Sequence, residues 1–182
     1  MRRSLLPIIT TMAFALAPVD GAVAEDKPAP PSTKPPPPGC TAPEHRQFDF
    51  WLGDWTVREP SGKVVGENHL TSLHKGCVLY ENWTGAGGFT GSSLNIYDAE
   101  RRKWHQTWTD ISGGLLRLDG ELVDGKMVLA GASAPDAQGT ITLQRITWTP
   151  LPDSRVRQHW EASYDAGKTW TTAFDGYYTK MK

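Results

Sequence analysis

Short runs of β-branched and aromatic residues, separated by turn residues about every 8 to 14 positions, fill the sequence after residue 53. Gly-Gly, Asp-Gly and Pro-Asp pairs mark many of the breaks, and almost no segment shows the period of an amphipathic helix. The pattern predicts an all-β domain with ten strands in an antiparallel meander. The expected strands span residues 54–59, 63–73, 77–84, 90–97, 103–110, 115–123, 126–132, 140–149, 155–163 and 169–180.

Alternation within the runs assigns side chains to the two faces of the predicted sheet. An up-and-down barrel removes the edges of such a sheet, and about ten strands leave room for a small ligand among the interior side chains. We therefore expect a lipocalin-like barrel. Three sets of residues should each share a face: Trp104, Gln106 and Trp108; Val156, Gln158, Trp160 and Ala162; and Trp170, Phe174 and Tyr178.

The N-terminal region has the features of an exported protein. Arg2 and Arg3 precede an apolar run, and Ala22-Val23-Ala24 offers the small residues of a cleavage site, so residues 1–24 are predicted to be a signal peptide. Residues 25–39 are rich in proline and predict a disordered linker. The remaining 40–182 have the usual size of one domain. A periplasmic or secreted protein is expected, with no membrane span.

Charge and cysteine content narrow the function classes. The formal net charge of −1, with no basic run, gives no indication of nucleic-acid binding. Cys40 and Cys77 are the two cysteines, and an even pair in an oxidising compartment predicts one disulfide bond. A redox role would need a closer Cys-x-x-Cys pair.

The stretch "SYDAGKTW", from Ser163 to Trp170, fits the Asp-box pattern found in propeller enzymes. A propeller needs at least about four blades of roughly 40 residues each, which this domain is too short to supply. At a hairpin the same residues have a local role, because Asp165 can accept turn N–H groups and Gly167 can take a positive φ. We therefore interpret the motif as a turn.

The opening "RQFDFWLGDW" and the later "GCVLYENWTG", "KWHQTW" and "FDGYY" run through the domain. With these motifs the chain resembles a bacterial family of lipocalin-like (calycin) domains of unknown function. The Gly-x-Trp spacing of Gly53 and Trp55 is similar to the start of the first strand in calycin barrels. There the Trp closes the barrel bottom under a basic side chain from a late strand. The resemblance implies a barrel fold and no established reaction, cofactor or catalytic residue.

Polar residues within the aromatic strands are the candidate ligand contacts. A mostly apolar pocket with a few oriented polar groups is typical of small-molecule sites. The leading hypothesis is therefore a barrel that binds a small, mostly apolar molecule, while the oligomeric state stays open. The candidate binding residues are Glu81, Trp83, Asn95, Tyr97, His105, Gln106, Trp108, Arg145, Gln158 and Trp160.

Two other function classes remain open. One is a cofactor-independent hydrolase or isomerase that uses a cavity carboxylate, Glu81 or Glu161, with His105 as a further candidate. The other is a structural or interaction domain without a ligand. No metal is expected, because the histidines lack the spacing of a zinc motif. Haem bound through His105 is a minor alternative, since this histidine lies in the most aromatic run.

Overall fold

Ten strands and three short 3-10 helices make up the regular structure of residues 39–182, the part that the computed structural model describes. The helices are η1 (Pro43–Arg46), η2 (Asp49–Trp51) and η3 (His74–Gly76). The strands are β1 (Gly53–Arg58), β2 (Val64–Leu73), β3 (Val78–Gly85), β4 (Thr90–Asp98), β5 (Lys103–Asp110), β6 (Leu115–Val123), β7 (Lys126–Ala132), β8 (Leu143–Pro150), β9 (Val156–Ser163) and β10 (Thr171–Lys180).

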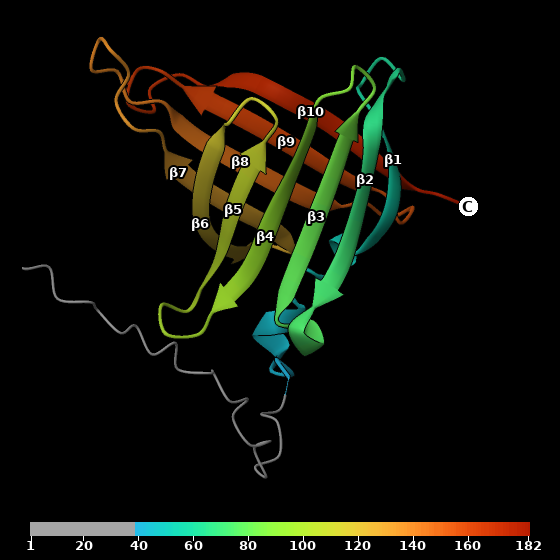
Figure 1. Ribbon diagram of the computed structural model, residues 1–182. Helices are drawn as coiled ribbons and strands as arrows, with labels where there is room; N and C mark the ends of the chain where they lie inside the picture. The colour runs from blue at the N-terminus through green and yellow to red at the C-terminus, as the bar shows by residue number, and fades with distance from the viewer. Residues whose placement is uncertain (1–38) are drawn as a thin grey trace, which may run out of the picture. The chain divides into compact units, whose positions relative to one another are not determined.

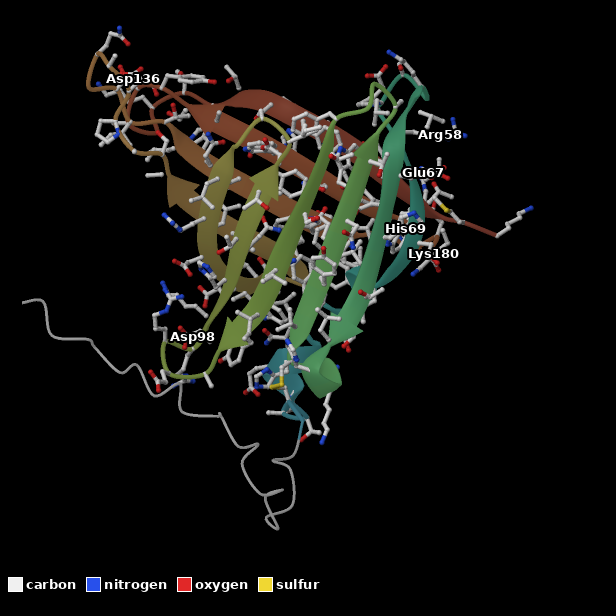
Figure 2. All side chains as sticks on the ribbon, viewed as in Figure 1. Arg58, Glu67, His69, Asp98, Asp136 and Lys180 are labelled. Atoms are coloured by element: carbon white, nitrogen blue, oxygen red, sulfur yellow. A yellow bond between two sulfur atoms is a disulfide. The ribbon has the colours of Figure 1, made fainter. Side chains whose placement is uncertain are left out.

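Every strand pairs antiparallel with the next strand in the sequence, and β1 pairs with β10, so the sheet closes into a barrel (Figure 1). The predicted up-and-down barrel of ten strands is confirmed. Residues 140–142 do not join β8 as predicted, because Ser133 and Asp136 hold them in the long β7–β8 loop by hydrogen bonds to the N–H groups of Thr142 and Thr140. Most charged residues lie outside, as Figure 2 shows for Arg58 and Glu67.

Aromatic side chains close the end of the barrel near η2. Phe48 stacks on Trp51 with ring centroids 5.0 Å apart, and Trp51 lies 5.1 Å from Trp148. Trp55 is also fully buried, and the Lys180 ammonium lies 4.0 Å from its ring centroid. This is the contact between an early Trp and a late basic residue that the resemblance predicted. We call this cluster the aromatic plug. It fills one end of the barrel and does not extend into the opposite half.

A disulfide bond joins Cys40 to Cys77, as predicted. It connects the segment before η1 to the residue that precedes β3, across a sequence separation of 37 residues. The same end of the molecule is further linked by Arg46, whose guanidinium donates to the Gly76 carbonyl. The predicted signal peptide, and the predicted linker except for Gly39, lie outside the described residues.

A β-bulge in β10 overturns one predicted face. The register against β9 shifts between Thr172 and Phe174, so Phe174 and Tyr178 face the interior, while the chain before the bulge has the opposite parity. Trp170 consequently packs outside the barrel, where the Arg145 guanidinium lies 4.3 Å from its ring. Strict alternation had placed Trp170 on the face of Phe174, and an inserted residue is not visible in the pattern.

The Asp-box residues form the turn between β9 and β10. The Asp165 carboxylate accepts from the Ser163 hydroxyl at 2.9 Å and from the Thr169 N–H at 2.9 Å. Gly167 has a φ of 86°. These hydrogen bonds lower the pKa of Asp165 to about 2, led by the Thr169 hydroxyl. The turn interpretation accounts for each of these positions without a catalytic role.

Candidate functional site

A cavity of about 230 Å³ lies in the half of the barrel opposite the aromatic plug. Its walls are mostly aromatic: Trp83 from β3, Trp108 from β5, Trp160 from β9 and Phe174 from β10. At the open end, Phe89 from the β3–β4 turn lines the cavity and is 44% exposed. The volume is below the range of about 300–1,000 Å³ common for ligand pockets, which indicates a small ligand.

Two glycines shape the aromatic walls. A Cβ at Gly91 would lie 2.2 Å from the ring of Trp108, and one at Gly66 would lie 2.7 Å from the ring of Trp83. Both glycines are on strands adjacent to the tryptophans, so each indole ring can lie close to the neighbouring strand's backbone. Side chains at these two positions would push the rings inward and fill the cavity.

Glu81 provides the acidic group of the cavity. It faces inward from β3, is 4% exposed, and has hydrogen bonds to both carboxyl oxygens. Asn68 Nδ2 donates to Oε1 at 2.8 Å, and the Ser93 hydroxyl donates to Oε2 at 2.6 Å. Asn68 is on β2 and Ser93 on β4, so the two flanking strands fix the carboxyl from both sides.

A chain of side-chain hydrogen bonds continues from Ser93 along the inner face of β4 to β5. Asn95 Nδ2 donates to the Ser93 oxygen at 2.8 Å, and Gln106 Nε2 donates to Asn95 Oδ1 at 2.9 Å. Asn95 and Gln106 are opposite each other in the β4–β5 register and are almost completely buried. Their donors therefore point along the chain toward Glu81, which polarises the Ser93 hydroxyl toward the carboxyl.

Burial raises the pKa of Glu81 from 4.5 to about 7, and the hydrogen bonds from Ser93 and Asn68 oppose this shift only in part. Burial, followed by the nearby charge of Glu81, also holds the pKa of Tyr178 well above 10.0. The Tyr178 hydroxyl donates to Gln158 Oε1, and both residues line the cavity. Near neutral pH the cavity thus holds a carboxyl that readily changes its protonation state beside a phenol that stays neutral.

The cavity lining brings together five of the predicted site residues: Glu81, Trp83, Trp108, Gln158 and Trp160. Asn95 and Gln106 point into the barrel but lie behind the lining, in the hydrogen-bond chain to Glu81. Tyr97 belongs to the plugged end, where its ring lies 6.1 Å from that of Trp104.

His105 and Arg145 have their partners on the outer face. The His105 ring nitrogens lie 2.9 Å from Asp119 Oδ1 and 2.8 Å from the Thr107 hydroxyl. Arg145 donates to Glu161 at 2.9 Å. Among residues 39–182 no histidine lines the cavity, so the cavity does not fit a haem ligated by His105, and Glu161 does not face Glu81 across it.

Sequence reasoning missed Phe89, Phe174 and Tyr178 as lining residues, together with Asn68 as a partner of Glu81. A usable signal was present for Asn68, which lies two residues before the apolar Leu70 and so shares its inward face. Within the described region there is no group of three or more potential metal ligands. None of the helices seen there is long and apolar enough to cross a membrane.

No protein-family model matches the chain, and no curated protein matches it with significant similarity. The resemblance to the family of lipocalin-like domains therefore stays a prediction, whereas the barrel fold is defined by the strand pairing.

Proposed function

We propose that this chain is an exported barrel protein that binds a small, mostly apolar molecule in the cavity beside Glu81. The observation that carries the proposal is the cavity itself, whose aromatic walls surround one buried carboxyl and the Gln158 amide. Aromatic walls supply contact area, and a few convergent polar groups orient a ligand, which is the usual composition of small-molecule sites.

The shape of the cavity supports binding over a purely structural role. Gly66 and Gly91 keep two indole rings against the wall, although larger residues at these positions would fill the space and bury more apolar surface. The space that this arrangement leaves open is what a ligand-binding barrel requires. For export, the support is the disulfide bond, which persists in oxidising compartments, together with the N-terminal sequence pattern.

The test uses 4-phenylbutan-1-ol as an apolar probe with one polar end. We expect saturable binding by isothermal titration calorimetry and quenching of tryptophan fluorescence. Gly91→Ala should weaken binding by about tenfold or more, because its Cβ displaces the Trp108 ring into the cavity. Gly87→Ala is the matched control, because no atom lies within 4 Å of a Cβ there. Equal binding by both variants would place the probe outside the cavity and contradict the proposal.

A second candidate function is proton transfer catalysed by Glu81. A buried carboxyl whose pKa is about 7 is suited to general acid–base catalysis near neutral pH. Such an enzyme would be an isomerase or hydrolase of a small apolar substrate and would rely on Glu81 without Glu161. A pH–rate profile with an inflection near 7, lost in Glu81→Gln, would identify it. Binding without turnover in a substrate screen would favour the carrier.

A further inference from the structure

The cavity lining contains an acidic side chain and no basic side chain from the described residues. Glu81 and Tyr178 are the titratable residues in its lining, and no Lys, Arg or His from residues 39–182 lines it. None of the ion pairs among the described residues includes Glu81, which has Asn68 and Ser93, both uncharged, as its hydrogen-bond partners. A buried carboxylate without a cation is costly, and a well-placed partner of opposite charge offsets part of that cost.

The aromatic walls favour a cation as that partner. The rings of Trp83, Trp108 and Trp160 line the space next to Glu81, and the face of an indole ring carries the negative electrostatic potential that attracts a cation. The same domain pairs cations with indoles elsewhere, since Lys180 lies over Trp55 and Arg145 over Trp170. An organic ammonium group could thus contact an aromatic face and the carboxylate together, while its apolar body fills the rest of the cavity.

Acceptor oxygens near Glu81 have unused capacity for hydrogen bonds. Asn68 Oδ1 is buried and has no hydrogen-bond partner among the described residues. Both Glu81 oxygens accept one hydrogen bond each from the protein and have capacity for another. A ligand that brings several N–H donors suits this unused capacity better than a carbonyl or a carboxylate, which bring acceptors.

We infer that the natural ligand of this cavity is a small apolar amine, bound as the ammonium ion by Glu81 and by the surrounding aromatic rings. This inference rests on the proposed function and names its ligand class. Anionic molecules of the same shape are repelled by the Glu81 carboxylate. Neutral ones lack the ion pair and bind through apolar contact and a single hydrogen bond.

The test compares three probes with the same phenylbutyl body: 4-phenylbutylamine, 4-phenylbutan-1-ol and 4-phenylbutyrate. At pH 8 we expect the amine to bind at least about tenfold more tightly than the alcohol, and the butyrate to bind most weakly. Glu81→Gln should bring the ratio of amine to alcohol affinity close to one, whereas Glu67→Gln, an exposed residue on the outer face, should leave the ratio unchanged.

A pH series on the unmodified chain gives a readout that does not depend on a variant. Below pH 7 Glu81 takes up a proton and loses its charge, so the affinity for the amine should fall by about ten- to a hundredfold from pH 8 to pH 5. Tyr178 stays neutral throughout and contributes no change. The affinity for the alcohol should vary much less.

The outcomes separate the two proposals. If the alcohol binds and the amine has no advantage, or keeps its advantage in Glu81→Gln, the amine inference is wrong and the binding function stands. A preference for the butyrate overturns the amine inference in the same way. If none of the three probes binds, the binding function fails and the inference fails with it.

Discussion

Glu81→Gln should make the domain more stable at alkaline pH, and this effect has a defined sign. In the unfolded chain the carboxyl has a pKa of 4.5, whereas in the folded chain burial raises it to about 7. Between these values the folded chain holds one proton more than the unfolded chain, so the free energy of unfolding falls as pH rises. The full stability is present below 4.5, and the loss is complete above about 7.

The size of the effect follows from the same interval. One proton held across one pH unit corresponds to about 1.4 kcal/mol, so the interval from 4.5 to about 7 amounts to about 3 kcal/mol. Glutamine has nearly the shape of the neutral acid and carries no charge at any pH. The variant should therefore match the unmodified chain at pH 4.5 and exceed its unfolding free energy by about 3 kcal/mol at pH 8.5.

Urea unfolding followed by tryptophan fluorescence and far-ultraviolet circular dichroism measures both quantities. The informative value is the difference between the variant and the unmodified chain at each pH, because groups that titrate elsewhere cancel in it. Glu67→Gln is the control, since its side chain is exposed and its replacement changes no buried charge. A difference that stays the same at pH 4.5 and 8.5 would refute the claim that Glu81 is buried without a compensating cation.

Two further predictions concern the closed end of the barrel. The double variant Cys40→Ser with Cys77→Ser should lose about 4 kcal/mol of unfolding free energy in urea, from closure of a loop of 37 residues, and added reductant should then have no further effect. If the double variant and the oxidised, unmodified chain were equally stable, the disulfide bond would not stabilise the fold. Lys180→Met should lose about 1 kcal/mol in the same assay, because the cation over Trp55 and the hydrogen bond to the Leu52 carbonyl are both removed. Lys180→Arg, which keeps the charge, should recover part of that loss.

The sequence predicted the barrel well because each strand carries its own local signals. Turn residues such as Asp124-Gly125, where both φ values are positive, fix the ends of hairpins, and period-two alternation fixes their faces. The shared face of Trp104 and Gln106 followed directly from this rule, and the structure places that face inside the barrel. The rule assigned Trp170 to the wrong face, because a bulge adds one residue to a strand and cannot be recognised in the alternation.

The candidate site was less predictable, because the sequence of a single strand does not show how far along the barrel axis each side chain lies. Tyr97 and Trp108 both belong to aromatic strands, yet Tyr97 lies at the plugged end and Trp108 at the open end. Arg145 stands beside Ile146, and only the register decides that the isoleucine lines the cavity while the arginine pairs with Glu161 outside. Which residues line the cavity can therefore be decided only when the pairing of all ten strands in the barrel is known.

Glu81 and the disulfide bond have opposite effects of similar size. Ionised Glu81 costs about 3 kcal/mol at alkaline pH, and the disulfide bond contributes about 4 kcal/mol by restricting the unfolded chain. Glutamine at position 81 would keep the shape and avoid the cost, so selection for stability alone would not retain a carboxyl there. The ionised carboxyl destabilises the domain when the cavity is empty. It becomes a favourable binding partner when a cation enters the cavity. The same feature that weakens the empty barrel thus gives the cavity its expected preference for an ammonium group.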